Sequence, residues 1–262
     1  MPTSGECVNA VVEDRLAVVT IDHRPVNALN RQTMEELSRA IDSLAQDPVV
    51  KVIIITGGGS VAFVAGADIK EVSELKSSQE AREVSALGQA VFLKLEGLHK
   101  PVIAAINGVC LGGGLELAMA CHLRVSGDRV RFGQPEINLG IMPGWGGTQR
   151  LPRLIGKAKA IEWILTGDIV SAQEAHRLGL VNNVVPQDQV LKAAKDLARK
   201  LASKGVVALT QSLRAIEEGL TGSLEAGLAK EANAFGMVAE SEDGKEGIRA
   251  FFEKRQPQFK DR

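Results

Sequence analysis

Aromatic side chains are scarce in this sequence. The chain contains no tyrosine, and Phe and Trp together make up 3% of its residues. Sugar-binding sites and single-stranded nucleic-acid sites both depend on aromatic rings as stacking platforms. A glycosidase, which would also use paired carboxylates, and a single-strand nucleic-acid binder are therefore disfavoured.

Cysteine and histidine are also few. Cys7, Cys110 and Cys121 form no C-x-x-C pair and leave one thiol unpaired under any bridging scheme. We therefore expect no disulfides and a reducing compartment. The four histidines show neither H-x-x-x-H nor H-E-x-x-H spacing, so we predict no metal site.

Long apolar runs, a strong net charge and a targeting pattern are absent from the sequence. No apolar run approaches the ~18 residues that a membrane span needs. The net charge of -1 provides no field that would recruit nucleic acid or an anionic membrane. Residues 1–6 carry neither a basic, apolar signal pattern nor an Arg-rich transit pattern. We expect a cytoplasmic protein whose partner is a small molecule, with no membrane and no nucleic acid.

Three common catalytic and nucleotide-binding motifs are missing as well. The chain has no G-x-x-x-x-G-K-[ST] phosphate loop, no G-x-S-x-G nucleophile elbow, and no G-x-G-x-x-G that opens a helix after a strand. These absences argue against a P-loop nucleotidase, a serine hydrolase of the elbow type and a dinucleotide-dependent dehydrogenase.

The chain does contain a clear α/β pattern. Its 262 residues, 45% of them hydrophobic, can bury a large core. Strand-like apolar runs alternate with helical patterns as far as Pro186, and only helical patterns follow. We therefore predict an α/β core over residues 1–186 and a helical region over residues 187–262. Four helices are expected in that region, separated near Gly205, Gly222 and Gly244.

The stretch that organises the chain is NGVCLGGGLELAMA at 107–120. The run 101–106 suits a buried strand and 115–121 a buried helix, which places Gly112, Gly113 and Gly114 at a strand-to-helix turn. The first N–H groups of a helix lack partners and carry partial positive charge, and glycines let a ligand oxygen approach them. This is the geometry of an oxyanion hole. The alternative is that the glycines serve only the backbone angles of a turn.

Two carboxylates are the catalytic candidates. Glu116 follows the glycine turn by one helical turn, and Glu136 lies in the turn-rich segment GQPEINLG at 133–140. Two carboxylates that face one bond can protonate one atom and activate water for another, each transfer contributing ~10² to 10⁴ in rate. The alternatives are a Glu116 that only stabilises the helix dipole and a Glu136 that caps a turn at the surface.

Four motifs, taken in order, resemble those of the enoyl-CoA hydratase (crotonase) family. They are AGADI at 65–69, NGVCLGGGLELA at 107–118, FGQPEI at 132–137 and PGWGGTQRL at 143–151. The similarity continues in register from about residue 8 to residue 260. Each motif is weak alone, whereas four in this order are highly specific.

The resemblance implies a fold and an assembly. It implies an α/β, crotonase-like spiral of repeated ββα units, followed by an all-helical C-terminal region that builds a homotrimer, usually stacked as a hexamer. The substrate would be an acyl-CoA, in fatty-acid β-oxidation or a related pathway. No cofactor is implied, because coenzyme A is part of the substrate.

The same resemblance implies the roles of four residues. The backbone N–H groups of Ala67 and Gly113 would hold the thioester oxygen, and each such donor is typically worth about 2.7–4 kcal/mol of transition-state stabilisation. Glu116 would orient and deprotonate a water that adds to C3 of a trans-2-enoyl thioester. Glu136 would deliver the proton to C2.

Substrate-binding residues follow from the same resemblance. They are Arg24, Val26, Ala28, Ala65, Asp68, Ile69, Lys70 and Pro135. Main-chain groups around Ala65, Asp68 and Ile69 would meet the adenine, and Val26 and Ala28 would line the pantetheine channel. Arg24 and Lys70 are the expected phosphate contacts, although exposed cations near a loop are often merely solvated.

Three questions stay open at the level of sequence. Trp145 replaces the small residue common in this glycine loop of the family, and its indole either shortens the acyl pocket or packs against the loop. Isomerases, lyases and hydrolases share the family, although the presence of both Glu116 and Glu136 favours hydration. An RNA-binding role would use the basic stripe from Lys192 to Lys204, but its balancing acids and helical spacing favour a solvated helix face instead.

Overall fold

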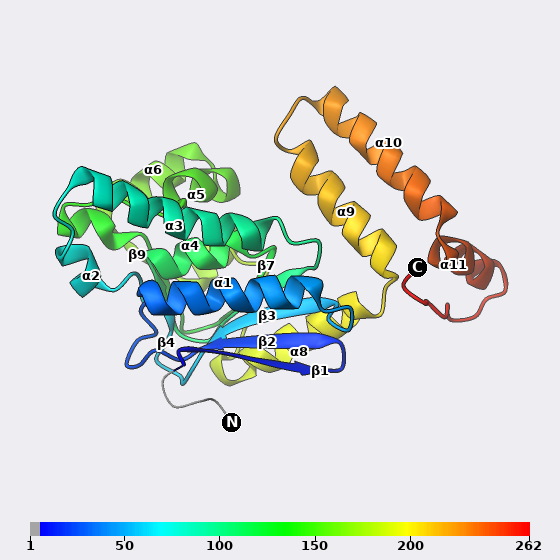
Figure 1. Ribbon diagram of the computed structural model, residues 1–262, viewed down its shortest axis with the longest axis horizontal. Coiled ribbons are helices and arrows are strands. Elements are labelled where there is room, and N and C mark those ends of the chain that lie inside the picture. The colour runs from blue at the N-terminus through cyan, green and yellow to red at the C-terminus, as the bar shows by residue number, and fades with distance from the viewer. Residues whose placement is uncertain (1–5) are drawn as a thin grey trace.

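Two β-sheets form the centre of the computed structural model, which describes residues 6–262 (Figure 1). In this part of the chain the larger sheet has six strands in the order β1-β2-β3-β5-β7-β10, and the smaller has four in the order β4-β6-β8-β9. The larger sheet comprises β1 (Val8–Glu13), β2 (Leu16–Ile21), β3 (Val52–Gly57), β5 (Val102–Ile106), β7 (Leu123–Gly127) and β10 (Asn183–Val185). The smaller comprises β4 (Ala62–Val64), β6 (Val109–Leu111), β8 (Arg131–Gly133) and β9 (Ile169–Ser171). All pairings are parallel except β1 with β2 and β8 with β9.

The chain winds through both sheets in a repeated unit. Each unit places one strand in the larger sheet and the next in the smaller sheet, and then forms helices. The first is β3, β4, α2 (Ile69–Ser73) and α3 (Ser78–Glu96); the second is β5, β6 and α4 (Gly113–Ala120). The third is β7, β8, the 3-10 helix η1 (Pro135–Leu139), α5 (Gly147–Ile155) and α6 (Lys157–Thr166), and α7 (Ala172–Arg177) then leads to β10. The predicted spiral of ββα units is therefore confirmed.

Helices cover both faces of the larger sheet. Strands β3 and β5 read VIIITG and VIAAI and are buried at every residue, as expected of central parallel strands. The first helix, α1 (Arg31–Gln46), is capped by the Asn30 side chain, and it packs with α3 on one face. The opposite face is covered by α8 (Val190–Ala202), which follows η2 (Gln187–Gln189). Because α8 lies beyond Pro186 and still packs on the sheet, the α/β packing continues past the predicted boundary.

The remaining helices form an arm that projects from this core (Figure 1). The arm comprises α9 (Val206–Gly219), α10 (Leu224–Glu240) and α11 (Glu242–Phe252). Gly205 and Gly222 flank helices as predicted, but the prediction of a break at Gly244 is wrong. The break falls at Ser241, whose hydroxyl accepts a hydrogen bond from the Gly244 N–H and so caps α11.

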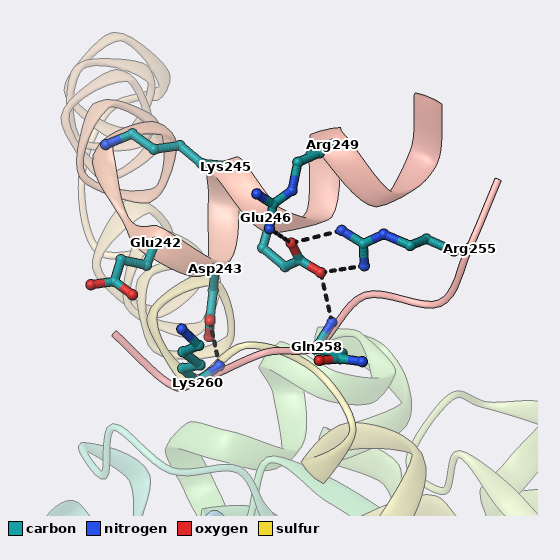
Figure 2. A pocket seen from close by; sticks show the side chains of 8 residues that line it. All are labelled: Glu242, Asp243, Lys245, Glu246, Arg249, Arg255, Gln258 and Lys260. Atoms are coloured by element: carbon teal, nitrogen blue, oxygen red, sulfur yellow. Dashed lines mark hydrogen bonds and ion pairs between the residues drawn. The ribbon is translucent and has the colours of Figure 1, made fainter. Parts of the chain in front are cut away.

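Charged side chains of α11 line a pocket beside the C-terminal tail, residues 253–262, and hold the tail in place (Figure 2). The Asp243 carboxylate accepts the backbone N–H groups of Lys260 and Asp261, at 2.6 and 2.8 Å. Glu246 accepts from the Gln258 N–H at 2.9 Å and pairs with Arg255. The carboxylates of Asp243 and Glu246 are therefore engaged in holding the tail.

The smaller sheet is where sequence prediction was least complete. The segment 63–69 is rich in small residues, a composition typical of a loop, yet its first residues belong to β4. No sequence pattern indicates β6 or β9. The segment 142–150 is glycine-rich and favours a loop, but α5 begins inside it at Gly147. These strands have three residues each, too few to show a period of two.

The structure also bears on the membrane prediction. Every helix within residues 6–262 is too short or too polar to cross a bilayer. The expectation that residues 1–6 carry no targeting pattern concerns mainly residues 1–5, which lie outside the described part of the chain. A cytoplasmic location stays a prediction.

Candidate active site

The turn between β6 and α4 is fixed from several sides. Gly112 adopts φ +50° and ψ −125°, a conformation that favours glycine. Its N–H donates to the Gly133 carbonyl and its carbonyl accepts from Gln134 Nε2, both at 3.0 Å. The same carbonyl accepts the backbone N–H of Glu116 at 3.0 Å. This turn therefore starts α4 with a defined direction.

Ala67 and Gly113 lie next to each other at this turn. A Cβ placed on Gly113 would stand 3.3 Å from the Ala67 nitrogen. Leu29 forms a parallel bridge with Ala67, donating to the Gly66 carbonyl and accepting from the Asp68 N–H. In such a bridge the N–H of the central residue, Ala67, points away from the pairing strand. Within residues 6–262, neither the Ala67 N–H nor the Gly113 N–H makes a hydrogen bond.

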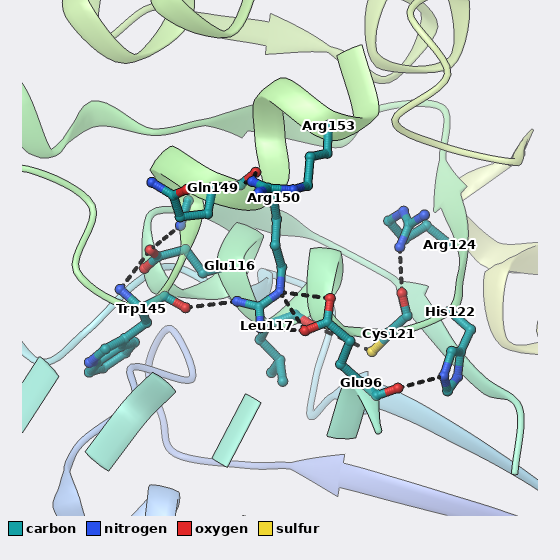
Figure 3. A network of polar contacts seen from close by, with 11 residues as sticks. Glu96, Glu116, Leu117, Cys121, His122, Arg124, Trp145, Gln149, Arg150 and Arg153 are labelled. Atoms are coloured by element: carbon teal, nitrogen blue, oxygen red, sulfur yellow. Dashed lines mark hydrogen bonds and ion pairs between the residues drawn. The ribbon is translucent and has the colours of Figure 1, made fainter. Parts of the chain in front are cut away.

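The Glu116 side chain is buried and held by the glycine loop. Its Oε1 accepts the backbone N–H groups of Trp145 at 2.8 Å and Gly147 at 2.7 Å (Figure 3). The residue is 2% exposed. Burial raises the pKa of Glu116, while the N–H groups of Gly147 and Trp145 and the charge of Arg150 oppose this rise.

Glu136 has a partly buried carboxyl with an unpaired oxygen. It is the second residue of η1. Its Oε2 is buried and has no hydrogen-bond partner within the described residues. Burial raises the pKa of Glu136 to about 7, with a further contribution from the charge of Glu116. A carboxyl with this pKa is protonated in a large fraction of molecules near neutral pH, and can donate a proton.

The two carboxylates and the two free N–H groups meet at one place. Oε1 of Glu136 would lie 3.1 Å from a Cβ placed on Gly112, the residue that precedes Gly113. Glu116 extends from the first turn of α4, the helix that Gly113 begins, and interacts electrostatically with Glu136. The structure therefore brings together Glu116, Glu136, Ala67 and Gly113, whose catalytic roles stay predictions.

The two loops predicted to contact coenzyme A pair with each other. The Ala65 N–H donates to the Val26 carbonyl at 3.1 Å, and the buried Asn27 side chain donates to the Ala62 carbonyl at 2.8 Å. Val26 and Ala28 are half-buried beside this ladder. The N–H groups of Ala65 and Asp68 are both used inside the protein, so other main-chain groups are left for an adenine.

The remaining predicted binding residues differ in their surroundings. The Asp68 carboxylate caps α2 by accepting the Lys70 N–H at 2.9 Å. Ile69 and Lys70 are exposed at the start of α2. Arg24 is exposed and pairs with Asp22 at 3.1 Å, so its guanidinium is partly engaged. Pro135 opens η1 directly before Glu136.

Trp145 packs as a wall of the site. Its indole lies edge-on to Phe92, with ring centroids 5.9 Å apart, and its Nε1 donates to the Val84 carbonyl at 3.3 Å. A Cβ on Gly88 of α3 would stand 2.3 Å from the indole, and one on Gly113 would stand 2.6 Å from it. The indole therefore fills the space between α3 and the start of α4.

Sequence reasoning missed the residues that support this site. Gln134 is fully buried and holds the Gly112 carbonyl, and Arg150 contacts the glycine loop while pairing with Glu96. Gln134 and Arg150 stand inside the FGQPEI and PGWGGTQRL motifs, which was the available signal. Glu96 ends α3 and shows no local pattern that would distinguish it from a solvated helix residue.

Metal ligands do not gather in the described structure. No group of three or more His, Cys, Asp or Glu within residues 6–262 is arranged to hold a metal ion. The predicted absence of a cofactor stays a prediction.

Comparison with known proteins identifies the family. A sequence profile described as enoyl-CoA hydratase/isomerase matches residues 12–262. This chain belongs to the enoyl-CoA hydratase/isomerase family. It is 47% identical over 248 residues to the crotonyl-CoA hydratase of Syntrophomonas wolfei, an alignment that covers 94% of this chain and 95% of that protein. It is 46% identical over 252 residues to the short-chain-enoyl-CoA hydratase of Clostridium acetobutylicum, covering 95% and 96%.

A solved structure from the family shares the fold. The enoyl-CoA hydratase of Bacillus anthracis superimposes with a TM-score of 0.94 at 38% sequence identity, covering 98% of this chain and all of that one. Family membership thus agrees with the resemblance drawn from the four motifs.

Proposed function

We propose that this enzyme is an enoyl-CoA hydratase that adds water reversibly across the 2,3 double bond of a trans-2-enoyl-CoA thioester. The observation that carries the proposal is the meeting of two unengaged N–H groups, those of Ala67 and Gly113, with the carboxyl groups of Glu116 and Glu136. The relatives named as hydratases of crotonyl-CoA and of short-chain enoyl-CoA support the same reaction.

The two N–H groups activate the substrate as an oxyanion hole. The thioester oxygen accepts hydrogen bonds from Ala67 and Gly113, and each bond strengthens as negative charge develops on that oxygen. Each donor is typically worth about 2.7–4 kcal/mol in the transition state. Polarising the carbonyl makes C3 electrophilic and stabilises the enolate, so that water is a sufficient nucleophile.

The carboxyl groups then move the protons. Ionised Glu116 takes a proton from the water whose oxygen bonds to C3, and protonated Glu136 gives a proton to C2. The hydroxyl group stays on C3, and the thioester carbonyl is restored as the enolate collapses. Burial supports both roles, because it raises the pKa of Glu116, which becomes a stronger base, and raises the pKa of Glu136 to about 7, so that about half of the Glu136 side chains are protonated near pH 7.

Coenzyme A occupies the paired loops in this proposal. Val26 and Ala28 line the pantetheine channel, and main-chain groups around Ala65 and Ile69 meet the adenine. Lys70 is exposed and unpaired with any acid in the described residues, which makes it a better phosphate contact than Arg24, already paired with Asp22.

The arm is the proposed oligomerisation surface. Leu220, Leu224, Phe235, Phe251 and Phe252 have exposed fractions of 73–82%. So many large apolar side chains on one short helical region are unusual for a surface in water and typical of an interface. We propose a trimer, or a hexamer of two trimers, and sedimentation equilibrium measures the subunit number.

The test of the reaction is crotonyl-CoA hydration, followed by loss of the enoyl thioester absorbance. Glu116→Gln and Glu136→Gln should each lower kcat by at least ~10² with the fold intact. Glu162→Gln, which removes an exposed carboxylate paired with Lys159, is the matched control. Unchanged turnover in both site variants would falsify the assignment.

The choice of substrate separates hydration from the isomerase activity of the same family. Wild-type enzyme should convert trans-2-enoyl thioesters to 3-hydroxyacyl thioesters far faster than it moves the double bond of a trans-3-enoyl thioester. The reverse preference would indicate an isomerase, the other activity in the family's description. A panel of enoyl-CoA esters of increasing chain length then defines the acyl preference.

A further inference from the structure

The direction of the Glu116 carboxylate is set by the loop 145–147 and not by its own helix, α4. Both hydrogen bonds to its Oε1 come from backbone N–H groups, those of Trp145 and Gly147. These belong to the peptide groups on either side of the one that joins Trp145 to Gly146. Whatever fixes that middle peptide group therefore sets the direction of both donors.

Arg150 contacts the middle peptide group. Its Nη1 donates to the Trp145 carbonyl at 3.0 Å (Figure 3). A Cβ placed on Gly146 would stand 2.1 Å from the same Nη1, so the guanidinium lies directly against the loop backbone. Gly146 has φ +114°, a conformation that an L side chain rarely adopts. The loop therefore donates two backbone hydrogen bonds to Glu116 and accepts one from Arg150 through the Trp145 carbonyl.

Glu96 in turn holds the guanidinium. Its Oε2 lies 2.7 Å from Nη2 of Arg150, and Nε of Arg150 lies 3.2 Å from Oε1. The Arg150 side chain is only 11% exposed. A forked guanidinium can bind a carboxylate and a carbonyl at fixed angles, which an ammonium group does not reproduce. This chain of contacts runs from the end of α3 through α5 and the loop to the first turn of α4.

We propose that Arg150 is a positioning residue of this active site: held by Glu96, it fixes the loop 145–147, and the loop fixes the carboxylate of Glu116. The inference rests on the proposed role of Glu116 toward water. Arg150 does not touch the substrate, and its effect passes through the backbone.

The charge of Arg150 gives the proposal a second measurable consequence, the pH dependence of kcat. The charged groups that face Glu116 are Arg150 from α5 and Glu136 from η1. Glu96 also interacts with Glu217 of α9, and its carbonyl contacts the His122 ring. Because Arg150 opposes the effect of burial on the pKa of Glu116, its removal should move the acidic limb of the kcat profile to higher pH.

The test compares four variants, together with Glu116→Gln, with wild type in crotonyl-CoA hydration across pH. Arg150→Gln should lower kcat by at least about tenfold with KM changed much less, and should raise the pH of the acidic limb. Arg150→Lys keeps the charge without the fork, so kcat should fall while the limb stays near its wild-type position. Glu96→Gln should also lower kcat, because the guanidinium loses its anchor. Arg153→Gln is the control, since Arg153 is exposed on the same helix and, within residues 6–262, bonds only Gln149.

The outcomes separate this proposal from the function on which it rests. If Glu116→Gln impairs turnover while Arg150→Gln and Arg150→Lys match Arg153→Gln in kcat and in the acidic limb, the positioning role is overturned and the hydratase assignment stands. If Glu116→Gln itself turns over normally, the role of Glu116 toward water is overturned, and the positioning role of Arg150 falls with it; the hydratase assignment falls only if Glu136→Gln also turns over normally. Should Arg150→Gln not fold, Arg150→Lys and Glu96→Gln decide: wild-type kcat in both overturns the proposal, and a selective loss of kcat supports it.

Discussion

The carboxylate of Glu136 lies directly against the backbone of Gly112, because a Cβ placed on Gly112 would stand 3.1 Å from Oε1. Gly112→Ala should therefore displace Glu136 and strain the turn, whose φ is +50°. We expect kcat for crotonyl-CoA to fall at least about tenfold, since small displacements of catalytic groups cost that much. Steady-state kinetics measures the loss.

Gly156→Ala is the matched control for that substitution. Gly156 also has a positive φ, +84°, but open space surrounds the position of its Cβ. This variant should lose about 1 kcal/mol or more of stability through backbone strain and keep its kcat. Equal losses of kcat in the two variants would show that strain alone, and not contact with Glu136, explains the effect.

The raised pKa of Glu136 predicts the alkaline limb of the pH profile. Glu136 must be protonated to give a proton to C2, and its pKa is raised by burial to about 7. The hydration rate kcat/KM should therefore fall as pH rises above about 7, through one ionisation of the free enzyme. Glu136→Gln should abolish this limb along with most of the activity. A wild-type profile that stays flat from pH 6 to pH 9 would contradict the assignment.

The same group predicts how stability depends on pH. Its pKa is about 7 when folded and about 4.5 in an unfolded chain, so between these values the folded protein binds more protons. The free energy of unfolding should therefore fall as pH rises from about 4.5 to 7. Glu136→Gln removes the cost of ionising a partly buried carboxyl and should stabilise the protein at pH 8 by about 1–3 kcal/mol, a range reduced for partial exposure. Urea titrations at pH 5 and pH 8 test this, because the gain should appear mainly at pH 8.

The indole of Trp145 predicts a large effect on stability. It is 8% exposed and fills the space that side chains on Gly88 and Gly113 would need. Trp145→Ala should cost about 3–5 kcal/mol through the lost burial and the cavity left behind. Gly88→Ala should cost about 1–3 kcal/mol because the ring must move. Chemical denaturation measures both, and a cost below about 1 kcal/mol for Trp145→Ala would show that the indole does not brace the loop.

Much of the larger sheet could be predicted from the sequence. Val52–Ile55 and Val102–Ile106 are continuous apolar runs, and the Asn30 cap marks the start of α1. The smaller sheet could not be predicted by pattern, since strands such as Val109–Leu111 have only three residues beside a glycine turn. The ββα repeat is a repeat of geometry, and side chains at equivalent places differ too much to show it by eye.

The reacting groups were predictable and their supports were not. Glu116, Glu136, Ala67 and Gly113 stand in motifs whose order carried the resemblance. The partner of Arg150 is Glu96, which lies 54 residues earlier on another helix. A salt bridge between residues so far apart in sequence is formed by the fold, so no local sequence pattern indicates it.

The last prediction concerns the tail that joins the arm to the core. The Lys51 side chain is 3% exposed, and its Nζ lies 2.5 Å from Oδ1 of Asp261, which also pairs with Arg15. Asp261→Asn leaves the buried ammonium without a countercharge, which typically costs about 3–5 kcal/mol. Glu242→Gln removes an exposed pair with Arg262 and should cost about 0–1 kcal/mol. Urea unfolding at pH 7 compares the two variants. If they lose equal stability, Asp261 does not compensate Lys51, and the backbone carbonyls of Ala202 and Lys204 are sufficient to hold the ammonium.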